Sequence, residues 1–560
     1  MKEKIEILIN EVLNNLNIEG SNFSIEHPED FKNGDYSTNV AMVFAKELKT
    51  NPKELSLKIK TELEKNLPKE ILKVEIAGPG FINFYLAPEF FSENLKEVLN
   101  KKENFGKNNR LHGKKHIVEY TDPNPFKEFH IGHLMSNTIG EAISRIIEAS
   151  GAEVKRACYQ GDVGLHVAKT IWGLQKEGHE KVENIRDSAM AYALGSKSYD
   201  DHKEEINEIN KKVYEKSDEK INQLYDTGKE KSLEYFESLY KKLGTKFDFY
   251  FFESETGILG KDIVLKNVGD IFEKSDGAIV FKGENFHPSL HTRVFVNKEG
   301  LPTYEAKELG LAKIKYGIYP YTNSIVITGN EVNEYFRVLL EAMEQVFPDL
   351  AEKTKHISHG MLRLPSGKMS SRTGDVITAE SLLSLVGEKV KEKVQDTKRE
   401  EMSDEFINQV SVASLKYSIL RQAIGGDIIF DFDKSISFEG DSGPYLQYSY
   451  ARAKSILEKA EKENISVSVT MPNNWLTTEI EKMLYQFPEV VLRSSVEFAP
   501  HYIATYLIEL SRAYNNFYGN NQIVKVDDET SPYKLAITEA FSIIMKSGLR
   551  LLGIETPERM

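Results

Sequence analysis

Cysteine and tryptophan are scarce in this chain of 560 residues, which contains one cysteine, Cys158, and two tryptophans. One thiol cannot form an intramolecular disulfide, and it cannot supply the several thiolates of a typical structural zinc site. We therefore expect a protein of a reducing compartment such as the cytoplasm, without structural zinc.

Long apolar runs are also absent, because no stretch approaches the roughly 20 apolar residues that span a bilayer. The N-terminal MKEKIEILINEVLNNL has apolar residues at helical spacing and no small-residue cleavage site, which favours an amphipathic helix over an export signal. The net charge of −14 argues against bulk attraction to nucleic acid, but a local basic groove can still bind a polyanion. The sequence predicts no membrane contact and leaves a nucleic-acid partner open.

Changes of pattern divide the chain into three regions. Residues 1–108 combine helical periodicity with period-two strands and end in a linker rich in lysine and asparagine, which predicts a small α+β domain. Residues 109–380 alternate short apolar strands with helices, the pattern of an α/β fold with a Rossmann-like doubly wound parallel sheet. Residues 381–560 contain only amphipathic helical patterns, which predicts an all-α domain.

Within the middle region, five apolar segments are strand candidates: HIVEYT from His116, AEVKRACYQ from Ala152, AIVFK from Ala278, TRVFVN from Thr292 and SIVITG from Ser324. The stretch from about 180 to 245 is instead highly charged with helical periodicity. It predicts two or three surface helices inserted into, or connecting, the halves of the sheet.

Two histidines flank a glycine in His130-Ile131-Gly132-His133, where the first predicted strand gives way to a helix. The glycine lets a nucleotide ring approach the backbone, and the helix N-terminus directs N–H groups toward phosphates. The imidazoles can donate hydrogen bonds to phosphate oxygens that gain charge during displacement. The alternative is that both histidines only fill space at a helix start.

A second basic segment, GKMSSRTGDVIT at 367–378, has the composition of a loop that closes over a triphosphate. Lys368 and Arg372 flank Met369, Ser370 and Ser371 in it. Taken alone, such a segment is more often a solvated surface turn. Together with the two histidines it predicts a two-part ATP clamp.

These two motifs resemble the HIGH and KMSKS signatures of class I aminoacyl-tRNA synthetases. HIGH is matched letter for letter, and KMSSR differs in that Ser371 stands where the second lysine usually is. The resemblance implies ATP contacts for the residues of both motifs, and it leaves open whether Lys368 or Arg372 carries most of the pyrophosphate contact.

The segment VEYTDPNPFKEFHIGH resembles the arginyl family's V-E-x-x-x-P-N-x-x-K-x-x-H-x-G-H, which places Glu119, Asn124 and His130 at substrate-contacting positions. In PTYEAKELG, Tyr304 and Glu308 occupy the places of the family's tyrosine and aspartate, and Glu308 is one methylene longer. Paired carboxylates are the best partners of a guanidinium fork. The alternative for Glu308 is an exposed carboxylate at a helix start.

Three further candidates lie at the ends of predicted strands. Asn330 or Glu331, in ITGNEVNEYF, follows the last strand candidate, where the family contacts ligand, and the sequence does not decide between them. Asp162 and His166, in YQGDVGLHVAK, lie at another strand end, where ligands collect in open α/β sheets, but both can equally be packed turn residues.

The ends of the chain resemble the same family. Residues 33–86 are similar to its additional N-terminal domain, which implies a contact with the outer corner of tRNA, and the C-terminal region resembles its anticodon-binding domain. Tyr448, Tyr518 and Met560 are candidates there for contacting unstacked bases. Either tyrosine can instead be a packing residue, and Arg452 can be a phosphate contact or a surface charge.

The resemblance implies an arginine–tRNA ligase that uses Mg-ATP, L-arginine and tRNA(Arg), works as a monomer and activates arginine only with tRNA bound. A nucleotidyltransferase that does not act on tRNA is one rival, although it has no use for the helical domain. A catalytically dead tRNA-binding module is another, although its motifs would not need to be intact. Cysteine activation is disfavoured because Cys158 alone cannot build a thiolate-rich zinc site.

Overall fold

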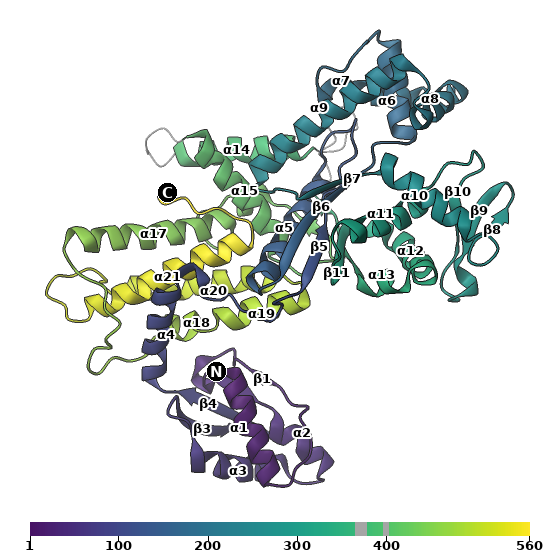
Figure 1. The fold of residues 1–560 in the computed structure, drawn as a ribbon. Coiled ribbons are helices and arrows are strands. Elements are labelled where there is room, and N and C mark those ends of the chain that lie inside the picture. The colour runs from purple at the N-terminus through teal and green to yellow at the C-terminus, as the bar shows by residue number, and fades with distance from the viewer. Residues whose placement is uncertain (364–377, 396–402) are drawn as a thin grey trace. The chain divides into compact units, whose positions relative to one another are not determined.

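The structure is a computed structural model that describes residues 1–363, 378–395 and 403–560 (Figure 1). Contacts divide the chain into two units, each assembled from three separate segments. The first unit consists of Met1–Phe105, Arg452–Phe487 and Glu509–Met545, and the second of Gly106–Ala451, Pro488–Ile508 and Lys546–Met560.

The N-terminal part of the first unit is an α+β fold with a four-stranded antiparallel sheet in the order β1-β2-β4-β3. The strands are β1 (Ile25–Glu26), β2 (Tyr36–Thr38), β3 (Ile71–Ala77) and β4 (Phe81–Leu86). The helices are α1 (Lys2–Asn15), α2 (Val40–Glu47), α3 (Pro52–Leu63) and α4 (Pro88–Lys101). Buried side chains of the sheet and of all four helices form one hydrophobic core.

The other segments of the first unit are helical. They contain α18 (Glu479–Leu484) and parts of α17 (Gly443–Lys462), α20 (His501–Asn520) and α21 (Ser531–Leu551). Tyr485, which follows α18, belongs to the N-terminal hydrophobic core. The neighbouring Lys482 forms an ion pair of 3.1 Å with the buried Asp35. The N-terminal fold and α18 are therefore parts of one structural unit.

The second unit contains a five-stranded parallel sheet in the order β12-β11-β5-β6-β7. Its strands are β5 (Lys115–Glu119), β6 (Glu153–Gln160), β7 (Phe249–Phe252), β11 (Asn323–Gly329) and β12 (Thr354–His359). Consecutive strands run outward from β5 on one side and from β11 on the other, so the strand order reverses between these two. The predicted doubly wound α/β fold is confirmed, and the crevice at this reversal is where ligands bind in such sheets.

Helices connect and cover these strands, which explains why the central strands are apolar on both faces. They are α5 (Ile131–Ala149), α6 (Leu165–Lys176), α10 (Glu253–Lys266), α11 (Tyr304–Ile318), α12 (Asn333–Val346) and α13 (Pro348–Lys353). The predicted strands at Ala278 and Thr292 form, but they join a separate antiparallel sheet in the order β10-β9-β8. That sheet comprises β8 (Glu273–Ser275), β9 (Ala278–Lys282) and β10 (Thr292–Val296).

The charged stretch between β6 and β7 forms three helices, α7 (Ile185–Lys197), α8 (Lys203–Glu215) and α9 (Glu219–Leu243). Their buried apolar residues pack with those of α6 in a hydrophobic cluster that includes Trp172, Ile206 and Leu224. The charges therefore belong to the outer faces of helices that have a core of their own.

The remaining elements of the second unit are mostly helical: α14 (Ala379–Gln395), α15 (Asp404–Leu420), α16 (Phe432–Ser435), most of α19 (Phe487–Glu497) and a strand pair, β13 (Leu362–Arg363) with β14 (Ile428–Ile429). Across the ranges that the structure describes, no helix is both long and apolar enough to cross a membrane.

Candidate active site

The loop from β5 to α5 has three non-glycine residues with positive φ angles: Thr121 at 83°, Asp122 at 48° and Phe126 at 71°. A β-branched residue such as threonine rarely adopts this conformation, and strain of this kind persists only where the surroundings fix it. Hydrogen bonds from three elements do so here. The Thr121 N–H donates to Ser136 of α5, Asp122 accepts the Tyr159 N–H of β6, and the Phe126 N–H donates to Ser232 of α9.

His130 and His133 form the N-terminal cap of α5, at the carboxyl edge of the sheet. Nδ1 of His130 accepts the N–H groups of Gly132 at 3.1 Å and His133 at 3.4 Å, and Nδ1 of His133 accepts the His130 N–H at 3.2 Å. The two rings are stacked with centroids 3.5 Å apart. Because both Nδ1 atoms act as acceptors, each neutral ring carries its proton on Nε2, where it can donate to a ligand.

Burial lowers the pKa of both histidines, and for His133 the neighbouring His130 lowers it further. Both rings are therefore neutral at physiological pH. A neutral pair at a helix N-terminus offers N–H donors and a partial positive charge, the combination that binds a phosphate group.

The predicted acid Glu119, at the end of β5, is only 1% exposed, and its Oε2 accepts a hydrogen bond of 2.7 Å from Lys315 of α11. Lys315 is also buried and donates to Ser324 of β11 at 3.3 Å. One oxygen of Glu119 is thus already paired with a cation of the protein. Lys315 thus connects the two strands that flank the reversal of strand order, β5 through Glu119 and β11 through Ser324.

Glu308, one turn into α11, has no hydrogen bond or ion pair within the described part of the chain. Burial raises the pKa of its carboxyl to about 8, and the negative charge of Glu119 adds to this. The pKa of the Asp122 carboxyl is also raised, by burial first and then by the negative charges of Glu119 and Glu308. Three acids therefore share one region, with Lys315 as a cation next to them.

Tyr304, at the start of α11, is 59% exposed, so its ring is accessible to a ligand. Lys307 of the same helix lies with its Nζ 5.2 Å from the centroid of this ring and donates to Glu253 at 2.6 Å. Glu253 and Lys307 are both buried, which adds a second internal ion pair at the edge of the acid cluster.

Asn124 lies against the backbone of the loop that follows β6. A Cβ atom on Gly161 would come within 2.3 Å of Asn124 Oδ1, so only glycine allows this approach. His166 donates from Nε2 to the Gly161 carbonyl at 2.9 Å, and burial lowers the pKa of its ring to about 3. Gly161 is therefore fixed from both sides, with Asn124 at the edge of the predicted pocket.

Asp162, the next residue, is fully buried and accepts four hydrogen bonds from the protein itself. Its donors are the Tyr225 hydroxyl and the Lys229 ammonium of α9, and both the N–H and the hydroxyl of Ser254 in α10, at 2.7 to 2.9 Å. These contacts favour the alternative that Asp162 is a packed turn residue, and the hydrogen bond of His166 to the Gly161 carbonyl fits the same role for His166.

Asn330 and Glu331 are both exposed after β11. The Glu331 carboxylate lies over Gly329, since a Cβ atom there would be 2.2 Å from Glu331 Oε2. Its negative charge also raises the pKa of His130 against the effect of burial. The geometry therefore favours Glu331 over Asn330 as the residue that faces the histidines.

The basic loop residues Lys368, Met369, Ser370, Ser371 and Arg372 lie outside the described residues. The described chain resumes at Thr378, which pairs with His130 in an antiparallel bridge, and the Ala379 N–H donates to the Phe129 carbonyl at 2.8 Å. The described chain thus resumes beside the histidine pair.

Three family models match the chain, covering most of its length. The model described as "tRNA synthetases class I (R), catalytic domain" matches residues 94–432, "Arginyl tRNA synthetase N terminal domain" matches residues 3–86, and "DALR anticodon binding domain" matches residues 446–560. The chain belongs to the arginyl-tRNA synthetase family.

Relatives in this family are similar over nearly their whole length. An arginine–tRNA ligase of Treponema denticola is 31% identical over 569 residues, which cover 96% of this chain and 95% of the relative. One of Fusobacterium nucleatum is 31% identical over 544 residues, which cover 94% and 93%. Among solved structures, the arginyl-tRNA synthetases of Thermus thermophilus and Plasmodium falciparum share the fold, with TM-scores of 0.82 and 0.81 at 23% and 20% identity. Each match covers at least 99% of both chains.

In this synthetase chain, the predicted tRNA-contacting residues are divided between the two units. In the first, Arg452 donates to Asn515 at 2.7 Å and its guanidinium lies 5.5 Å from the centroid of the Tyr518 ring, which is 42% exposed. In the second, Tyr448 and Met560 are half-buried. Tyr518 therefore has a ring available for stacking.

The sequence alone did not identify Asp122 as a member of the acid cluster, or Lys315 as the cation beside it. Asp122 directly precedes the Pro-Asn pair of the quoted motif. Lys315 follows Glu308 by two helical turns, so both residues lie on the same face of α11. That spacing could have indicated from the sequence that Lys315 lies beside Glu308. Among the described residues, no group of three or more histidine, cysteine, aspartate or glutamate side chains is arranged so that it could hold a metal ion.

Proposed function

We propose that this protein is an arginine–tRNA ligase that activates L-arginine with Mg-ATP and transfers it to the 3′-terminal adenosine of tRNA(Arg) in the cytoplasm. The observation that carries the proposal is a pair of adjacent sites at the reversal of strand order. One is a cluster of desolvated acids that has fewer cations than carboxylates. The other is a helix N-terminus capped by two neutral histidines.

The acid cluster suits a guanidinium group. Glu308 is the principal acceptor in this proposal, because its carboxylate has no partner within the described residues and its burial makes an unpaired negative charge costly. Glu119 offers its second oxygen while Lys315 holds the first. The tyrosine ring of Tyr304 can stack on the planar guanidinium.

The histidine pair suits the phosphates. In the first step the arginine carboxylate attacks the α-phosphate of Mg-ATP in line, pyrophosphate leaves, and no nucleophile of the protein is needed. Nε2–H groups of His130 and His133 donate to the phosphate oxygens that gain charge. Lys368 and Arg372 are proposed to contact the pyrophosphate, on the strength of the sequence motif alone.

In the second step a ribose hydroxyl of the terminal adenosine attacks the arginyl-adenylate, and AMP leaves. Class I membership points to the 2′-hydroxyl. For the tRNA itself, Arg452 and Tyr518 are the contacts we favour, because the guanidinium of Arg452 lies against a ring that is partly exposed for base stacking.

The test is pyrophosphate exchange into ATP over the twenty amino acids, with and without tRNA(Arg). We expect exchange with arginine alone among them, and only when tRNA is present. Exchange with another amino acid would overturn the substrate assignment. Exchange with none, in a folded protein that still binds tRNA, would favour the rival reading of a binding module.

A further inference from the structure

Two cations inside the second unit each join the C-terminal ends of the same two helices, α9 and α21. Lys416 of α15 donates from Nζ to the Leu243 carbonyl at the end of α9 and to the Gly553 carbonyl just beyond α21, both at 2.7 Å. The last carbonyls of a helix have no partner within the helix and carry partial negative charge, so a cation is a favourable partner there.

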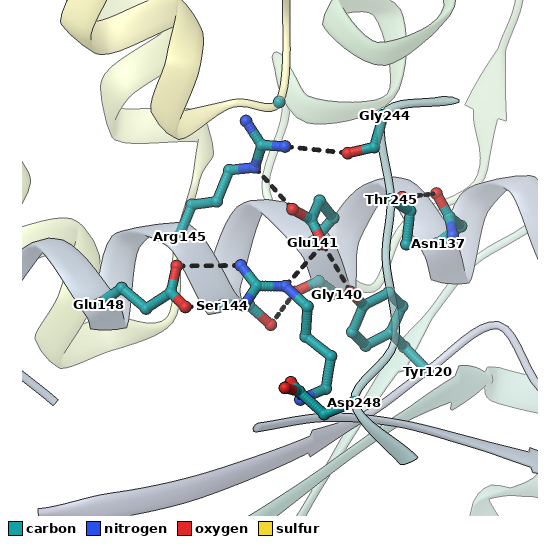
Figure 2. A network of polar contacts seen from close by, with 12 residues as sticks. Tyr120, Asn137, Gly140, Glu141, Ser144, Arg145, Glu148, Gly244, Thr245 and Asp248 are labelled. Carbon is teal, nitrogen blue, oxygen red and sulfur yellow. Dashed lines mark hydrogen bonds and ion pairs between the residues drawn. The ribbon is translucent and has the colours of Figure 1, made fainter. Parts of the chain in front are cut away.

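Arg145 makes the equivalent connection from α5. Its Nη2 donates to the Gly244 carbonyl after α9, and its Nη1 donates to the Arg550 carbonyl in the last turn of α21, both at 3.0 Å. Figure 2 shows its side chain reaching from α5 to Gly244. We refer to Lys416 and Arg145 together, with the four carbonyls that they bind, as the C-terminal clamp.

Glu141 fixes Arg145 in this orientation. Its Oε1 accepts a hydrogen bond of 2.6 Å from Arg145, and its Oε2 accepts one of 2.9 Å from Arg156 of β6 and one of 2.6 Å from the Tyr120 hydroxyl (Figure 2). Burial opposes ionisation of Glu141, but the charges of Arg145 and Arg156 lower its pKa to about 2. Glu148 accepts two further hydrogen bonds from Arg156, at 2.7 and 3.0 Å.

Burial of the Lys416 side chain at this position is energetically unfavourable. It is 1% exposed and its hydrogen bonds within the described chain are to carbonyls, without a carboxylate. Burial, followed by the positive charge of Arg145, lowers its pKa to about 7. Burying an ammonium group without a paired acid is costly in solvation. A methionine would avoid that cost but would leave the Leu243 and Gly553 carbonyls without this donor, so the ammonium serves to join the ends of α9 and α21.

The helices that the clamp joins lead to the proposed active site and to the anticodon-binding match. α5 begins at His130 and His133, and α9 supplies the Lys229 and Tyr225 contacts that hold Asp162 at the carboxyl edge of the sheet. α21 runs as one helix from the first unit into the second, inside the range 446–560 that matches the anticodon-binding domain. Its last turn belongs to the second unit and contains the Arg550 carbonyl that Arg145 of α5 binds.

We propose that Arg145 and Lys416 are positioning residues that transmit the state of the C-terminal helix α21 to the histidine end of α5, so that arginine activation responds to bound tRNA. This inference rests on the proposed function. Arg145 lies about three helical turns along α5 from His133, so the clamp acts through the placement of α5 and not through contact with the phosphates. The clamp then contributes to the coupling free energy between tRNA binding and arginine activation. This quantity is separate from the affinity for tRNA or for arginine.

The first test compares Lys416→Met and Arg145→Met with the wild-type enzyme and with Lys389→Met, a half-exposed lysine of α14. We measure arginine-dependent pyrophosphate exchange at saturating tRNA(Arg), the KM values for arginine and ATP, and the Kd for tRNA(Arg). For the clamp variants we expect kcat to fall about tenfold while the tRNA Kd stays within about twofold, which is the signature of lost coupling. Lys389→Met should match the wild type.

Two conservative variants test whether the clamp acts through its hydrogen bonds. Lys416→Arg keeps the charge and should recover part of the lost kcat. Arg145→Lys keeps the charge but loses the fork that reaches two carbonyls, so it should remain impaired. Equal effects on kcat and on tRNA affinity, or an unchanged kcat with a lower melting temperature, would show that the clamp is structural only and would overturn the inference.

Amide hydrogen exchange tests the inference without catalysis, so its result is informative even for a variant that is inactive for an unrelated reason. In the wild type, adding tRNA(Arg) should slow amide hydrogen exchange in α5, and in Lys416→Met it should not, although tRNA is bound. The same protection in both proteins would overturn the inference. A wild-type enzyme without arginine-dependent exchange would instead overturn the proposed function, so the two failures are distinguishable.

Discussion

At the scale of single residues, the main feature is an excess of acids over cations in one partly buried region. Glu119 is paired with Lys315, whereas Glu308 and Asp122 have raised pKa values because ionising them adds negative charge where little solvent is present. Leaving such acids unpaired is costly, and a substrate that brings a forked cation removes the cost. The same feature explains both affinity for arginine and rejection of uncharged side chains.

We expect Glu308→Gln to raise the KM for arginine about 100-fold and the KM for ATP less than about threefold, because a hydrogen bond to a charged group is worth roughly 1.5–3 kcal/mol. Steady-state pyrophosphate exchange with tRNA(Arg) present gives both constants. Glu299→Gln, at an exposed position, is the matched control and should leave both unchanged. If Glu308→Gln raised both KM values equally, the residue would support the fold of the site without binding arginine.

Arginine binding should also depend on pH. Glu308 has a raised pKa of about 8 in the ligand-free site, so it is mostly protonated below that pH and must lose its proton to accept a guanidinium charge. Binding therefore strengthens as pH rises through about 8 and weakens by up to about tenfold per unit below it. The arginine Kd measured by calorimetry between pH 6.5 and 8.5 tests this. The dependence should vanish in Glu308→Gln, and a flat profile in the wild type would contradict the assignment.

Two pairs of residues show which contacts of the site can be predicted from the sequence and which cannot. His130 and His133 could be assigned to a helix start because the capping residues and the helix are adjacent in the chain. The partner of Glu119 could not be found in that way, because Lys315 is 196 residues away and only the parallel pairing of β5 with β11 brings them together. The clamp residues were missed for the same reason.

At the scale of elements, strands were predictable where they have a buried apolar centre, as in KHIVE of β5 and NSIVITG of β11. β12 was missed because its sequence, TKHISH, is polar, and β7 was missed because four residues give too short a pattern. The segments of β9 and β10 were recognised, but a period-two pattern does not state the partner, and they belong to the antiparallel sheet.

The contacts of Asp162, which follows β6, connect the parallel sheet to the inserted helix α9. Asp162→Asn keeps the size of the side chain but leaves Lys229, whose side chain is 21% exposed, without its anion. We expect a loss of about 3 kcal/mol in the free energy of unfolding, since removing one partner of a buried pair is strongly destabilising. Hydrogen exchange should localise the loss to α9 and its neighbours. A change spread evenly over both units would show that Asp162 has no such local role.

At the scale of the whole molecule, neither unit is a continuous piece of chain. α17, α20 and α21 each contribute residues to both units, and the N-terminal fold shares its hydrophobic core with Tyr485, which follows α18. A linear division into three domains is what pattern changes along a sequence can indicate. The exchange of helices between units depends on three-dimensional packing, and no local pattern records it.

Tyr485 tests this division of the chain. It is 5% exposed, and its ring lies against His27, Tyr36, Phe90 and Phe91 with centroids 5.4 to 6.1 Å away. We expect Tyr485→Ala to destabilise the first unit by about 3–5 kcal/mol, the usual cost of removing a buried aromatic side chain, and to leave the second unit unchanged. In calorimetry the unfolding endotherm should split, with only the lower transition shifted from the wild-type position.

The control for this variant is Leu476→Ala, in the same unit at a side chain that is 84% exposed, which should change stability by less than about 0.5 kcal/mol. The active-site histidines and acids all belong to the second unit, so arginine and ATP should still protect the upper transition of Tyr485→Ala from unfolding. A single transition that shifts as a whole would mean that the long helices shared by both units make the chain unfold in one cooperative step.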